Sequence, residues 1–158
     1  MANKPIQKTT LAVLVLSLVG FLLPVSAGAQ QSHELRLTGD KTVPPVGTGA
    51  YGKLIVRFAD DTLTVSGSFE SLTGQYHSAG IFVGPEDERG NRLFLLTVDL
   101  NEEKTGGEFL AEKNKFHLNE PQKMWLAEGE FYISISSYEH VNGEIRAQLP
   151  AMGSGSIP

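Results

Sequence analysis

The chain has 158 residues, of which 18 are acidic and 13 are basic, and it contains no cysteine. The missing cysteines exclude disulfide bonds, thiol catalysis and thiolate metal sites. The acidic balance argues against nucleic acid and anionic membrane surfaces as partners, because both require a basic surface.

The first 29 residues differ from the rest of the chain. Lys4 and Lys8 form a basic start, an apolar run extends over residues 11–23, and Ala27-Gly28-Ala29 ends it with small residues. These three parts are typical of a secretory signal peptide. A retained membrane anchor is the alternative, but the run of about 13 residues is shorter than the roughly 20 that a membrane-spanning helix needs. We therefore predict cleavage after Ala29.

The expected mature chain is residues 30–158. It keeps all 18 acidic residues and 11 basic ones, so its net charge is 11 minus 18, or −7. Its length suits one domain with its own hydrophobic core. We expect a monomeric domain at 30–149, followed by a flexible Gly/Ser-rich tail at 150–158. The protein is expected to act in the periplasm, at the cell surface or in the medium, with no stable membrane anchor after cleavage.

Apolar and polar residues alternate along several short stretches, which is the period of half-buried β-strands. In the first half of the mature chain these stretches cover residues 34–38, 51–58, 62–69 and 76–83. Asp60-Asp61 separates two of them and predicts a β-hairpin. Pro44 and Pro45 cannot donate to a strand ladder, so residues 43–47 are not expected to form a central strand.

The second half is expected to contain strands at residues 92–100, 131–137 and 144–149. The first of these is rich in Leu and Val, which predicts deep burial. Between them, residues 109–118 fit either a strand or an irregular segment, and 121–128 fit a short helix that begins at Pro121 and ends before Gly129. Asn142-Gly143 predicts a tight turn between the last two strands. Roughly seven or eight short strands with turn signals about every 8 to 12 residues indicate an antiparallel, all-β sandwich.

Two segments resemble the CHRD domain family, the repeated domain of chordin that also occurs alone in exported bacterial proteins. Leu37-Thr38-Gly39 followed by residues 43–46 resembles the family's opening, and residues 129–135 with 143–149 are similar to its closing segment. The resemblance spans about residues 33–149 and implies an immunoglobulin-like sandwich. It implies no particular activity; in chordin the domain belongs to an extracellular antagonist of bone morphogenetic proteins. The signature positions, to which the resemblance gives a structural role, are Pro44, Pro45, Gly143, Glu144, Ile145 and Arg146.

The sequence departs from the family at its histidines. Family members usually carry His-Ile-His on a central strand and a further His near the end, where this chain has Gly80-Ile81-Phe82 and Ser136. Gly80 and Phe82 share a strand face, so the three positions form one patch if the two strands are neighbours. The remaining histidines contain no His-x-His pair of the kind a zinc or copper site requires; they are His33, His77, His117 and His140. We predict that the patch binds no metal and that Phe82 makes it an apolar contact surface.

Two further groups of residues are candidate sites. The loop at 85–91 contains Glu86-Asp87-Glu88, and oxygen-rich loops can bind calcium. This loop lacks the alternating acid spacing of a calcium site, which favours a solvated turn. Aromatic residues could instead form a platform for a sugar or a protein partner, or could fill the core; they are Phe82, Trp125, Tyr132 and Tyr138. No catalytic set and no phosphate-binding loop is present.

These observations predict an exported, non-catalytic module that binds an extracellular protein or carbohydrate, or has a structural role, without a cofactor or metal. The expected partner-contact patch consists of Phe82, Ser136, Tyr132 and Trp125. The alternative is a metal-dependent redox enzyme of the copper/zinc superoxide dismutase type, which shares the sandwich architecture but needs clustered histidines.

Overall fold

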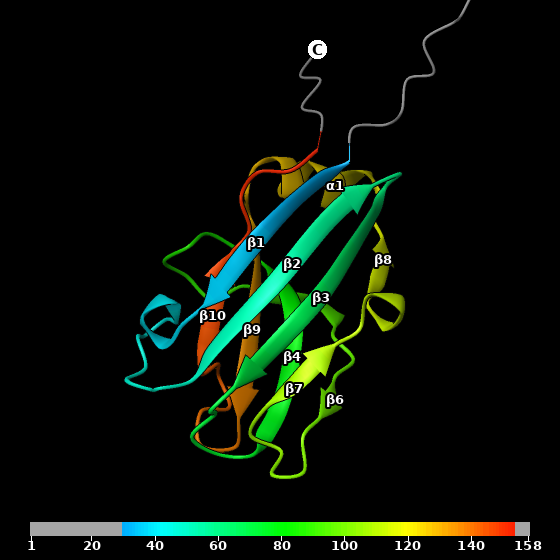
Figure 1. Ribbon diagram of the computed structural model, residues 1–158. Helices are drawn as coiled ribbons and strands as arrows, with labels where there is room; N and C mark the ends of the chain where they lie inside the picture. Colours follow the sequence, from blue (N-terminus) through cyan, green and yellow to red (C-terminus); the bar gives the residue numbers. More distant parts are fainter. Residues whose placement is uncertain (1–29, 154–158) are drawn as a thin grey trace, which may run out of the picture.

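The computed structural model describes residues 30–153. The predicted signal peptide and the last five residues of the predicted tail lie outside this part of the chain. Two antiparallel β-sheets face one another, and in Figure 1 the strands β1, β2 and β3 cross in front of β10, β9 and β4. The predicted all-β sandwich is confirmed.

The first sheet has the strand order β1-β2-β3-β7-β6, with the short strand β8 also paired to β3. Its strands are β1 (Gln31–Leu37), β2 (Tyr51–Ala59), β3 (Thr62–Glu70), β6 (Asp99–Leu100), β7 (Gly107–Phe109) and β8 (Lys115–His117). The β2–β3 hairpin is the predicted one: Ala59 pairs with Thr62, which leaves a two-residue turn at Asp60 and Asp61. Both turn residues have positive φ angles, of 49° and 57°, as the primed turns of tight hairpins require.

The second sheet has the order β10-β9-β4-β5. Its strands are β4 (Tyr76–Val83), β5 (Asn91–Leu95), β9 (Phe131–Ser137) and β10 (Ile145–Gln148). Strand β9 lies between β4 and β10, so that Phe82 pairs with Tyr132, and Ser78 with Ser136. This confirms that the two strands carrying the altered histidine positions are neighbours.

Alternate residues of the strands point between the two sheets and form the core. Ile133 and Ile135 on β9 and Ile145 on β10 are completely buried, as the alternation predicts. The opposite face of β9 is also covered, because Tyr132 is only 3% and Ser136 only 5% exposed. Loops therefore cover part of the outer face of the second sheet.

Residues 92–100 do not form the single, deeply buried strand that their composition predicts. They divide into β5 and β6, which belong to different sheets, and Leu96 is buried where the chain crosses between them. Leu95 is 59% and Leu100 is 39% exposed. The prediction was wrong because both strands lie at sheet edges, where an apolar side chain can face solvent.

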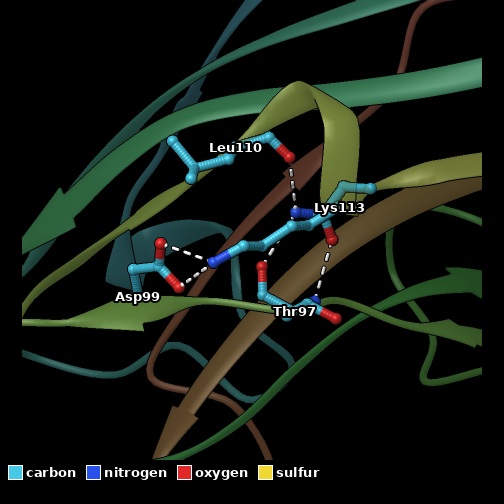
Figure 2. A network of polar contacts seen from close by, with 5 residues as sticks. Thr97, Asp99, Leu110 and Lys113 are labelled. Carbon is cyan, nitrogen blue, oxygen red and sulfur yellow. Dashed lines mark hydrogen bonds and ion pairs between the residues drawn. The ribbon is translucent and has the colours of Figure 1, made fainter.

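The ambiguous segment 109–118 contains β7, a 3₁₀ turn at Ala111–Lys113 and β8. Buried Asn114 ties it to the crossing segment: its Oδ1 accepts the amide of Thr97 at 2.8 Å, and its Nδ2 donates to the carbonyls of Thr97 and Leu110. Figure 2 shows this network with the exposed ion pair of Lys113 and Asp99, in which Nζ and Oδ1 are 2.6 Å apart. A buried side-chain amide needs such partners, so Asn114 fixes how the chain passes from one sheet to the other.

The predicted helix is confirmed as α1 (Glu120–Ala127). Asn119 caps it by accepting the amide of Gln122, whose side chain accepts the Asn119 amide in return. No helix within residues 30–153 is long and apolar enough to cross a membrane.

The chain stays packed beyond the predicted domain end at residue 149. Met152 is 1% exposed and its amide donates to the carbonyl of Leu126 on α1. An apolar side chain of the Gly/Ser-rich segment therefore docks on the core, and the flexible tail at 150–158 stays a prediction.

The burial of Ile135 gives a stability prediction. Ile135→Ala should lower the free energy of unfolding by about 2 to 5 kcal/mol, because it removes apolar volume from a packed core. Urea unfolding measures this difference. Ile55→Ala is the matched control, since Ile55 is 36% exposed on β2; it should cost about 1 kcal/mol or less. Equal losses for the two variants would contradict the assignment of faces.

Candidate functional site

A pocket of about 290 Å³ lies on the outer face of the second sheet. Its floor comes from β4 and β9, and its walls come from β5, β10 and three loops. The lining residues that matter below are His77, Ser78, Phe82, Arg89, Arg92, Tyr132, Ser134, Ser136 and Arg146. Two interactions of the closing segment shape this region, one made by Glu144 and the other by Arg146.

Glu144 is completely buried and its carboxylate joins three separate segments. Thr48, in the loop before β2, donates its hydroxyl at 2.7 Å. Thr73, in the loop before β4, donates both its amide at 2.7 Å and its hydroxyl at 2.8 Å. Ser137, at the end of β9, donates its hydroxyl to the other carboxylate oxygen. With all four donors in place, a buried charge can be held without an opposite charge beside it.

The same contacts set the ionisation of Glu144. Burial alone raises the pKa of a carboxyl group, but the hydrogen bonds from Ser137, Thr48 and Thr73 together outweigh it and lower the pKa of Glu144 below its ordinary value. The carboxylate is therefore ionised at neutral pH. The connection between β9 and β10 covers residues 138–144 and is wider than the tight turn predicted from Asn142-Gly143, because the Tyr138 amide donates to the carbonyl of Gln75 and not to the returning strand.

Arg146 is 2% exposed and anchors the loop between β4 and β5. Its two terminal nitrogens donate to the carbonyls of Glu88 and Pro85, each at 2.8 Å. Burial lowers the pKa of Arg146, while electrostatic interactions with Tyr132 and with the acids Glu86 and Asp87 oppose this shift. The guanidinium remains charged because the ordinary pKa of arginine lies far above neutral pH.

The same guanidinium lies over an aromatic pair. Its carbon is 3.6 Å from the centroid of the Tyr132 ring, and Tyr132 stacks on Phe82 with centroids 5.1 Å apart and planes 9° apart. The Tyr132 hydroxyl accepts the amide of Gly90 at 2.8 Å. Cation–π contact and ring stacking thus hold Arg146, Tyr132 and Phe82 in one fixed row across three strands.

These contacts explain the acidic loop at 85–91, which is the candidate calcium site of the sequence. Two of its carbonyl oxygens, at Pro85 and Glu88, accept the Arg146 guanidinium. A buried side-chain cation thus occupies oxygen atoms of the kind that calcium would need. This arrangement gives the loop a structural explanation that does not involve a metal.

A cluster of small polar groups lies at one end of the pocket. The Ser78 and Ser136 hydroxyls are 2.9 Å apart, and each lies 3.3 Å from Nδ1 of His77. Activation of a serine hydroxyl requires a base that a third group orients. No carboxylate within residues 30–153 is hydrogen-bonded to His77, so the cluster can bind polar groups but does not form a catalytic triad.

The structure brings together three of the four residues predicted to contact a partner. Phe82, Tyr132 and Ser136 line the pocket, whereas Trp125 is half-buried on α1 against the core. Gly80, the third altered histidine position, lies beside them: a Cβ added there would come within 2.7 Å of Cδ of Arg92. The missing side chain at Gly80 therefore leaves the space that Arg92 occupies.

Comparison with known families places this geometry in context. The family model of the CHRD domain matches residues 34–149. The chain belongs to the CHRD domain family. No curated protein and no solved structure matches it significantly. CHRD domains are generally non-enzymatic modules, so membership supports a binding or structural role as the kind of function. It gives no support to the alternative of a superoxide dismutase type of enzyme.

Several residues of this CHRD domain's site carry no signal in the sequence. Thr48 and Thr73 resemble any loop threonine, yet both bind Glu144. Arg89 and Arg92 fall in a polar loop and an edge strand, yet both line the pocket. The one sequence signal that points to such partners is the signature Glu144-Ile145-Arg146. Its two charged side chains face away from the core residue Ile145 and therefore need polar groups on that side.

The Glu144 interactions predict a pH-dependent stability. The depressed folded-state pKa means that this carboxylate stabilises the domain above the unfolded value of about 4.3 and that its contribution is lost as the pH falls through the folded value. Glu144→Gln should lower the free energy of unfolding by about 2 to 4 kcal/mol at pH 7, and the difference from wild type should shrink on acidification. Urea unfolding at several pH values measures this difference.

The control for that experiment is Glu139→Gln, because Glu139 is an exposed acid in the same loop. It should leave the free energy of unfolding nearly unchanged. A Glu144→Gln difference that is the same in acid as at neutral pH would show that the charge of Glu144 is not what stabilises the loops.

The altered histidine positions predict an absence of tight metal binding at the pocket. Within residues 30–153, no three His, Asp or Glu side chains are grouped so that they could hold a metal ion. Calorimetry of the untagged domain with zinc and with copper should show no site tighter than micromolar. Stoichiometric tight binding that is lost in His77→Ala would contradict this prediction.

Proposed function

We propose that this CHRD domain is an exported, non-catalytic module that recognises an extracellular protein or carbohydrate through the pocket of the second sheet. The observation that carries the proposal is the pocket itself, in which the row of Phe82, Tyr132 and Arg146 lies beside the hydroxyls of Ser78 and Ser136. Concave sites that combine a few fixed polar groups with aromatic surface are typical of ligand binding.

Rigidity of the pocket supports a binding role. Its aromatic floor is held by β4–β9 pairing, and the wall at 84–90 is held by Arg146 and by Tyr132. A preformed site loses little conformational entropy when a ligand binds. The same groups offer no activated nucleophile, which favours binding over catalysis.

Phe82→Ala tests this proposal directly. Immobilised domain should retain a specific partner from the native envelope or secretome, or a specific glycan from an array, and Phe82→Ala should reduce that retention by tenfold or more, because hot-spot aromatic side chains dominate binding energies. Leu95→Ala is the matched control, since Leu95 is an exposed apolar residue of β5 outside the pocket. If Phe82→Ala and Leu95→Ala reduce retention equally, or if neither reduces it, the pocket is not the contact site.

Export is part of the same proposal, and the basic start, apolar run and Ala27-Gly28-Ala29 support it. Mass spectrometry of the protein recovered from cells should show a chain that begins at Gln30. A dominant species that begins at Met1 in the membrane fraction would contradict cleavage.

A further inference from the structure

The pocket concentrates positive charge on an acidic protein. Three of the chain's five arginines line it, together with His77, and no acidic residue lines it. The three arginines are Arg89, Arg92 and Arg146. The chain as a whole has a net charge of −5. A positively charged pocket on a protein of negative net charge therefore calls for an explanation from the pocket itself.

None of these arginines is neutralised by an ion pair within the described residues. Every salt bridge between residues 30 and 153 uses a lysine, and no arginine nitrogen lies within 4 Å of a carboxylate oxygen. Arg146 donates to neutral oxygen atoms only, at Pro85, Glu88 and Gln148. Three acidic side chains, those of Asp40, Glu86 and Asp87, line instead a second pocket that shares Thr42 and Val43 with this one.

Arg146 also has a donor without a partner. Its side chain is almost fully buried, and its Nε is the one buried side-chain nitrogen or oxygen among residues 30–153 that makes no hydrogen bond. A buried unpaired donor on a charged group is costly. An anion in the pocket, which Arg146 lines, would offset this charge without any change in the fold.

The position of Arg92 is a second sign that the pocket is adapted to a charge. Its aliphatic part lies where a side chain on Gly80 would be, with Cδ 2.7 Å from the position of a Cβ. A side chain at 80 would collide with Arg92 and, at 2.8 Å, with the carbonyl oxygen of Phe94, so Arg92 would have to shift. Arg89 reaches the pocket from the loop that Arg146 anchors.

We infer that the pocket binds an oxyanion group on a sugar, namely the carboxylate of an acidic carbohydrate. The inference rests on the proposed binding function and assigns its ligand class. Arg89 and Arg92, which are exposed, supply charge-assisted donors to the carboxylate, and the buried charge of Arg146 adds to the positive potential of the pocket. The hydroxyls of Ser78, Ser134 and Ser136 match the hydroxyl groups of a sugar, and Phe82 offers an aromatic edge or face to its C–H surface.

Calorimetry with a galacturonate trisaccharide and with the uncharged galactose trisaccharide tests the inference on the chain of residues 30–158. The uronate should bind at least tenfold more tightly than the neutral sugar, and its affinity should fall as salt is added. Arg92→Gln and Arg89→Gln should each weaken uronate binding about tenfold. Both residues are exposed, so these variants should fold normally. Arg57→Gln, on the exposed face of β2, should leave binding unchanged.

The remaining arms identify the source of the charge. Inorganic sulfate and phosphate should bind more weakly than the uronate, because they lack the sugar hydroxyls. Any one of four results would overturn the inference. The neutral sugar could bind as tightly as the uronate, or Arg57→Gln could weaken uronate binding as much as Arg92→Gln does. An acidic peptide such as oligoglutamate could bind more tightly than the uronate, or the uronate could fail to bind at millimolar concentration. If one of these results is found while Phe82→Ala still reduces partner capture, the proposed binding function holds and only the assignment of an acidic carbohydrate as the ligand is wrong.

Discussion

The architecture around the site depends on one buried charge. The Glu144 carboxylate receives donors from Thr48, Thr73 and Ser137, which lie 96, 71 and 7 residues away in the sequence. The loops before β2 and β4 therefore meet the end of β9 at one end of the sandwich, where Figure 1 shows the β3–β4 and β9–β10 connections side by side. Since two strands begin directly after the loops that Glu144 holds, their entry points are fixed by a polar contact, while the apolar core behind them supplies most of the stability.

Arg146 holds the pocket in its shape, as Glu144 holds the loops together. Two residues further along the chain, it fixes the 84–90 wall through backbone carbonyls and covers the Tyr132 ring. Its backbone also pairs with Thr38 at the end of β1, which joins the two sheets at this edge. In this chain the three signature residues thus have three roles: Glu144 joins the loops at one end of the sandwich, Ile145 packs in the core, and Arg146 holds the wall and the aromatic floor of the pocket on the outer face.

The sequence predicted those features that depend on neighbours along the chain. The β2–β3 hairpin follows from two alternating stretches around Asp60-Asp61, and α1 follows from Pro121 and Gly129, because turns and caps are local. Residues 92–100 were assigned wrongly because hydrophobicity does not reveal which sheet an edge strand joins. In the site, the neighbourhood of Phe82, Tyr132 and Ser136 could be predicted from strand pairing, but Trp125 could not be placed without the helix packing. The partners of Glu144 and Arg146 were beyond prediction, since they are loop atoms brought near by the fold.

The central claim is that Glu144 is an ionised carboxylate whose hydrogen bonds tie the loops together. Carbon-13 NMR of the Glu144 side-chain carboxyl during a pH titration of the folded domain tests it most directly. The Glu144 signal should keep its ionised chemical shift down to a lower pH than the carboxyl of a glutamate in an unfolded peptide, whose pKa is about 4.3. A Glu144 signal that titrates at or above that reference value would show that burial outweighs the hydrogen bonds, and it would contradict the ionised, loop-joining role of Glu144.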